Sequence, residues 1–85
     1  MPEISRFFGI AIYIYFNDHN PPHFHAKYGK YEILVSLKGE ILEGKFPAKA
    51  QNFVLRWLEI NKEKLKENWK RAQKKKKLLK IKPLK

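Results

Sequence analysis

The chain has 85 residues, enough for one small domain whose hydrophobic core lies near the lower limit for independent folding. It contains no cysteine and no apolar run approaching the roughly 18 residues of a membrane span, which excludes disulfides, thiolate metal sites and membrane helices. Residues 1–61 carry seven Lys or Arg against six Asp or Glu, a net charge of +1, whereas residues 62–85 carry twelve against two, a net charge of +10. The opening residues MPEISRFFG lack the pattern of a signal peptide, so a cytoplasmic protein without membrane contact is expected.

The first half of the chain predicts an antiparallel sheet. Apolar residues occupy both alternating faces of Arg6–Phe16, which predicts a central strand, and Gly9 is expected to mark a bulge or a close backbone approach. Asn17–Pro22 is expected to form a turn, and Gly29-Lys30 suits a two-residue hairpin. Three further strands are predicted over His23–Tyr28, Tyr31–Leu37 and Ile41–Phe46.

The second half predicts helix. Pro47 suits a first helical turn, and helix is expected to end near Gln73. Asn61 is a good N-cap, so a break into two helices is favoured there, with one long helix as the alternative. We therefore predict an α+β domain over residues 1–73, with a four-stranded antiparallel meander followed by one or two helices on one face, and a basic tail over residues 74–85. The apolar helical stripe comprises Ala50, Phe53, Val54, Trp57, Leu58, Leu65 and Trp69.

The stretch DHNPPHFHA, from Asp18 to Ala26, holds every histidine of the chain: His19, His23 and His25. Because strand side chains alternate, His23 and His25 should share one solvent-accessible face, while Phe24 faces the core. An acidic side chain from a neighbouring strand, Glu32 or Glu43, is a candidate to orient one of the imidazoles.

Four interpretations of this stretch remain open. His19, His23 and His25 with a water would suit a zinc site. His23 and His25 would also suit metal-free cleavage of RNA, because imidazole exchanges protons near neutral pH and Arg6 or Lys27 would steady the phosphorane. The third interpretation is binding of nucleic acid or a protein partner without chemistry, and the fourth is a purely structural turn.

The basic residues predict contact with phosphate. Arg6, Lys27 and the run Lys74, Lys75, Lys76 and Lys77 are the candidates for nucleic-acid binding. Lysines outnumber arginines in the chain, which argues against bidentate, sequence-specific recognition of nucleic acid. The tail also fits a solvated face of the kind that heat-adapted proteins favour. No P-loop, dinucleotide fingerprint or nucleophile elbow is found, and no cofactor is expected.

The sequence also resembles a known family over roughly residues 1–73. The segments RFFGIAIYIYFNDHNPPHFHAKYG, KGEILEG, FPAKA, RWLE and ENW carry the resemblance to a small prokaryotic family, domain of unknown function 4160. Asn61 departs from that pattern, where a histidine is expected, and so does the long lysine-rich tail. The pattern falls on Arg6, Phe7, Gly9, Asp18, His19, Pro21, Pro22, His23, Phe24, His25, Ala26, Gly29, Gly39, Gly44, Pro47, Trp57, Leu65 and Trp69.

The resemblance implies membership of two-gene toxin–antitoxin-type modules but no mechanism or catalytic residues. The expected function is therefore a nucleic-acid- or partner-binding component of such a module, with RNA and DNA both open. The expected partners are nucleic acid, the neighbouring small protein of the module, and a second copy of the chain in a homodimer. The alternatives are a metal-independent ribonuclease toxin using the histidine pair and a histidine-ligated metal-dependent hydrolase.

Overall fold

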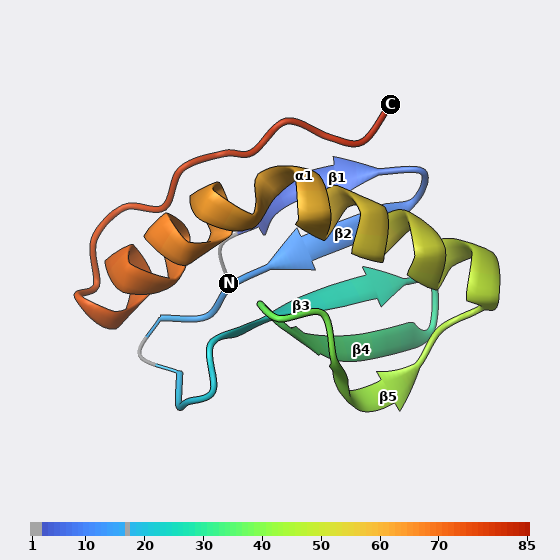
Figure 1. The fold of residues 1–85 in the computed structure, drawn as a ribbon, viewed down its shortest axis with the longest axis horizontal. Coiled ribbons are helices and arrows are strands. Elements are labelled where there is room, and N and C mark those ends of the chain that lie inside the picture. Colours follow the sequence, from blue (N-terminus) through green and yellow to red (C-terminus); the bar gives the residue numbers. More distant parts are fainter. Residues whose placement is uncertain (1–2, 17) are drawn as a thin grey trace.

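The computed structural model describes residues 3–16 and 18–85, and within these ranges the chain forms one antiparallel sheet and one long helix (Figure 1). The sheet runs in the order β1-β2-β3-β4-β5, so every strand pairs with its neighbour in sequence. Helix α1 lies across one face of this sheet (Figure 1). The elements are β1 (Glu3–Phe7), β2 (Ile10–Tyr13), β3 (His23–Tyr28), β4 (Tyr31–Ser36), β5 (Ile41–Lys45) and α1 (Ala48–Gln73).

The predicted α+β meander is present, but in the described residues the sheet has five strands and not four. The segment expected as one strand, Arg6–Phe16, contains a hairpin, because the chain turns at Phe8 and Gly9. Both residues have positive φ, 50° and 79°, which is the backbone conformation of a tight two-residue hairpin turn. Phe7 and Ile10 therefore pair across the hairpin, and both are buried.

The core lies between the sheet and α1. Phe24 and Ala26 of β3 are fully buried there, and the Phe24 ring contacts Trp57 of α1 at 5.7 Å between centroids. Trp57 and Trp69 are both buried, as the apolar stripe predicted. The alternation along β3 turns His25 away from this core.

Helix α1 is continuous from Ala48 to Gln73 but kinked at Asn61, where φ is −115° and ψ is 21°. The favoured break into two helices is therefore wrong and the alternative of one long helix is correct, with a kink at the position where the break was expected. The buried Asn61 side chain donates a hydrogen bond to the carbonyl oxygen of Trp57, 3.0 Å away, one turn earlier. This contact is the side-chain competition for backbone groups that bends helices.

The C-terminal segment, residues 74–85, turns back and packs against α1 and β1 (Figure 1). Asn68, fully buried in α1, exchanges two hydrogen bonds with the backbone of Leu79, at 2.9 and 2.8 Å. Trp57 Nε1 donates to the carbonyl oxygen of Lys82 at 2.9 Å. Ile81 and Leu84 belong to the hydrophobic core. The segment is thus part of the folded unit, and deleting it would remove core contacts.

In the part of the chain that the structure describes, no helix is long and apolar enough to cross a membrane.

Candidate functional site

Three side chains of the DHNPPHFHA stretch converge where the loop after β2 enters β3. The carboxylate of Asp18 comes from the loop, and its Oδ2 atom lies 2.9 Å from His23 Nε2 and 3.4 Å from His25 Nε2. The two imidazole rings lie side by side on β3, with centroids 5.3 Å apart, as their i, i+2 spacing predicted. We call this group the Asp18–His23–His25 cluster.

The Asp18 carboxylate is fixed by contacts on both sides. Its Oδ1 atom accepts a hydrogen bond from the His19 backbone N–H at 2.9 Å. The backbone carbonyl oxygen of Asp18 accepts another from the Gln73 side chain at 2.8 Å. Burial raises the pKa of Asp18, but the His19 backbone hydrogen bond, the His25 hydrogen bond and the attraction of the His23 and His19 rings together lower it below its ordinary value. The group is therefore a carboxylate at neutral pH.

His23 is the most enclosed member of the cluster, with 2% of its side chain exposed. Its Nδ1 atom lies 2.7 Å from the carbonyl oxygen of Pro21. A carbonyl only accepts hydrogen bonds, so Nδ1 carries a proton and donates it. The ring packs against Trp69 of α1, at 5.3 Å between centroids.

His25 lies between two carboxylates. Its Nε2 atom faces Asp18, and its Nδ1 atom is 3.5 Å from Glu32 Oε2, on the adjacent strand β4. Of the two acids expected to orient a histidine, Glu32 therefore contacts one. The Tyr15 ring covers the imidazole at 4.1 Å between centroids.

The burial of the histidine pair differs from the expected solvent-accessible face. His23 and His25 are only 3% and 8% exposed, because the Trp69 and Tyr15 rings cover them. His19 is instead at the surface, with 88% of its side chain exposed, and its Nδ1 atom contacts Asp18 Oδ1 at 3.2 Å. The structure thus joins Asp18, rather than His19, to the other two histidines.

The basic candidates do not form one patch with the histidines. Arg6 is 2.8 Å from the Glu3 carboxylate, which neutralises it locally, and Lys27 lies over the Tyr13 ring at 5.3 Å. Lys74 and Lys76 instead lie around a shallow depression beside Lys70 and Arg71 of α1. Lys75 and Lys77 are exposed in the same reversal of the chain.

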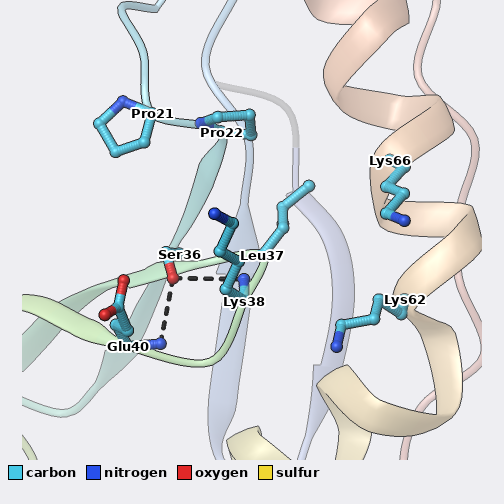
Figure 2. Close-up of a pocket in the computed structure, with 8 residues that line it drawn as sticks. All are labelled: Pro21, Pro22, Ser36, Leu37, Lys38, Glu40, Lys62 and Lys66. Atoms are coloured by element: carbon cyan, nitrogen blue, oxygen red, sulfur yellow. Dashed lines mark hydrogen bonds between the residues drawn. The ribbon is translucent and has the colours of Figure 1, made fainter.

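A cavity of about 360 Å³ lies between the Pro21–Pro22 loop, the β4–β5 turn and α1 (Figure 2). Ser36 Oγ accepts hydrogen bonds from two backbone N–H groups of the turn, at 3.2 and 3.0 Å, and so fixes that wall. Lys38, Lys62 and Lys66 surround the opening. Lys62 and Lys66 each pair with a glutamate of α1, and Glu40 lines the cavity together with Lys38, so charges of both signs surround it.

The sequence model of the family described as Domain of unknown function (DUF4160) matches residues 9–70. The chain belongs to this family. No match was found among curated proteins or among solved structures.

The DUF4160 match spans the Asp18–His23–His25 cluster and Glu32, and it ends before the C-terminal segment begins. Sequence reasoning placed Asp18 near the histidines but did not select it as a site residue. The available signal was its position just before Pro21 and Pro22, because these prolines restrict the loop that leads to His23. The roles of the Pro21 carbonyl, Gln73 and Trp69 carry no sequence signal of their own.

Proposed function

We propose that this domain is a nucleic-acid-binding component of a toxin–antitoxin-type module. The observation that carries the binding proposal is the chain reversal after Gln73. It gathers Lys70 and Arg71 of α1 with Lys74 and Lys76 around one depression of about 180 Å³. Clustered cations of this kind attract a phosphate backbone at long range.

The chemistry of this surface favours phosphate contact without base recognition. Arg71 Nε is held by Glu67 at 3.0 Å, so its guanidinium is partly occupied, and the lysines supply the free positive charge. Lysine ammonium groups bind phosphate as point charges and do not read base edges. We therefore expect similar affinity for unrelated sequences.

Binding is favoured over cleavage because of the histidine environment. A ribonuclease using His23 and His25 needs both imidazoles at one RNA phosphate, and the enclosed ring of His23 offers no such surface. The toxin–antitoxin context, the neighbouring protein as partner, a homodimer and a cytoplasmic location rest on the sequence alone. Expressing this gene and its neighbour separately and together tests the module assignment through growth.

The binding test is the salt dependence of affinity, measured by fluorescence anisotropy with short labelled RNA and duplex DNA. Replacing Lys70, Lys74 and Lys76 with glutamine should weaken binding. Each phosphate contact contributes a slope of about 0.7 on single strands and about 0.9 on duplex DNA, so the salt slope should fall by about two to three.

A matched triple variant changes Lys30, Lys45 and Lys49 to glutamine, which removes the same charge from exposed positions elsewhere. Its salt slope should stay within about one of the wild-type value. Equal losses in the two triple variants would mean that net charge alone drives binding. Absence of wild-type binding at low salt would also refute the proposal.

A further inference from the structure

We propose that the Asp18–His23–His25 cluster is a binding site for one divalent transition-metal ion, with Zn²⁺ as the first ion to test. One ligand atom from each of the three residues lies within 4.8 Å of the others. The inference goes beyond nucleic-acid binding and does not depend on it, because the basic depression is built from other residues.

The contacts of the His23 ring favour a bound cation. Its Nδ1 proton is donated to the Pro21 carbonyl, so in the neutral form of the ring it is the Nε2 lone pair that faces Asp18 Oδ2, 2.9 Å away. Two acceptors in contact repel one another. Metal-bound histidines show this same arrangement, with the second ring nitrogen donating to a backbone carbonyl.

A simple ion pair of protonated His23 with Asp18 does not describe the contact well. At 2.9 Å the distance suits a hydrogen bond, yet Nε2 makes none with any described residue. The carboxylate therefore lies off the direction in which Nε2–H would donate. Because the ring is almost entirely buried, an Nε2–H group without an acceptor there would be costly.

The surroundings of His25 also favour a bound cation. Both of its nitrogens face carboxylates, Asp18 at 3.4 Å and Glu32 at 3.5 Å, but a neutral imidazole has only one proton. Nδ1 has no hydrogen-bond partner among residues 3–16 and 18–85. A cation on Nε2 would leave the proton on Nδ1, and a small movement of the Glu32 side chain, 3.5 Å away, would complete the carboxylate–histidine–metal arrangement.

The two distances from Asp18 Oδ2 fit one ion, and the two histidine nitrogens, within 4.8 Å of each other, need at most a modest approach. Ligand atoms about 2.0–2.1 Å from a tetrahedral zinc lie about 3.3 Å from each other, and Asp18 Oδ2 is 2.9 and 3.4 Å from the two histidine nitrogens. Gln73 holds the backbone carbonyl oxygen of Asp18, and the His19 backbone N–H holds its Oδ1 atom. The Oδ2 atom is therefore left for the ion.

The donor set selects the class of ion. Two imidazole nitrogens with one carboxylate oxygen suit Zn²⁺ and other first-row divalent ions, whereas Mg²⁺ and Ca²⁺ prefer oxygen ligands throughout. Three protein ligands also leave the fourth coordination position of a tetrahedral ion for water.

Calorimetric titration of the untagged full chain with Zn²⁺ tests the proposal, because an added histidine tag would itself bind metal. One ion should bind per chain and raise the melting temperature. Co²⁺ should give the visible absorption of a low-symmetry nitrogen and oxygen site. Asp18→Asn and His25→Gln should each weaken binding by more than about 100-fold, and Glu32→Gln by about 10–100-fold.

His19→Gln is the control, because His19 lies outside the proposed ligand set and is exposed. It should change affinity by less than about 3-fold. Circular dichroism of each metal-free variant identifies any that fail to fold, and the nearly isosteric Asp18→Asn change then carries the test. Absence of one-to-one binding by the wild type would overturn the proposal and leave an ion-paired cluster. Equal losses in His19→Gln and His25→Gln would overturn the ligand assignment.

Discussion

Replacing Asn68 with alanine should loosen the C-terminal segment from the domain. The side chain is fully buried and makes two hydrogen bonds with the backbone of Leu79, each worth about 0.5–1.5 kcal/mol net. The loss is therefore about 2 kcal/mol. For a domain of this size, about 1 kcal/mol shifts the melting temperature by about 4–8 °C, so we expect a fall of about 8–16 °C.

Thermal and urea unfolding followed by circular dichroism measure this loss. Lys66→Ala is the matched control on the same half of α1, since Lys66 is exposed, and it should stay within about 0.5 kcal/mol of wild type. Hydrogen exchange at the Ile81 amide, which donates to the Ile4 carbonyl at 2.8 Å, should accelerate in Asn68→Ala. If both stability and this exchange rate match wild type, the two hydrogen bonds do not hold the segment and the reasoning is wrong.

Three further predictions concern the fold. Phe24→Ala should cost about 3–5 kcal/mol in urea unfolding because Phe24 is fully buried, whereas Phe16→Ala, at 45% exposure, should cost under about 1 kcal/mol; equal costs would contradict the packing. Gly44→Ala should lower the melting temperature strongly or abolish the cooperative transition, because φ is +86° and the new Cβ would collide with the backbone of β4. A variant as stable as wild type would exclude this collision. The hydrogen bond from Arg6 lowers the pKa of Glu3, so its small contribution is present above pH 4.5 and disappears as pH falls through the lowered value. Glu3→Gln should therefore reduce stability at pH 7 but not at pH 2, and an equal loss at both would show that the charge is not responsible.

Much of the fold follows from local patterns. The alternation over residues 23–28 and the turn at Gly29 give β3 and its hairpin, and the 3.6-residue stripe gives α1 with its end at Gln73. The β1–β2 hairpin was not predicted, because its flanks are apolar on both faces and Phe8 is an unusual residue for positive φ. Docking of the C-terminal segment was not predicted, because its polar anchors, Asn68 and the Trp57 indole N–H, lie in α1 and carry no local signal of a distant partner.

The candidate site was predicted in composition but not in environment. Strand alternation correctly places the His23 and His25 rings together and Phe24 in the core. It carries no information about what covers the other side, and here Trp69, 46 positions after His23, encloses one imidazole. Exposure depends on such long-range contacts, whereas periodicity depends only on the strand itself.

The position of the C-terminal segment beside β1 bears on self-association. An open sheet has two edge strands whose free backbone groups can pair with another chain and start aggregation. At the β1 edge, the Ile81 N–H and the Lys80 ammonium group bind the carbonyl oxygens of Ile4 and Glu3. At the opposite edge, β5 carries an irregular register and the charged side chains of its last residues. A chain cut after Gln73 would keep the β5 protection but uncover β1, so its edge would become a template for strand pairing between copies.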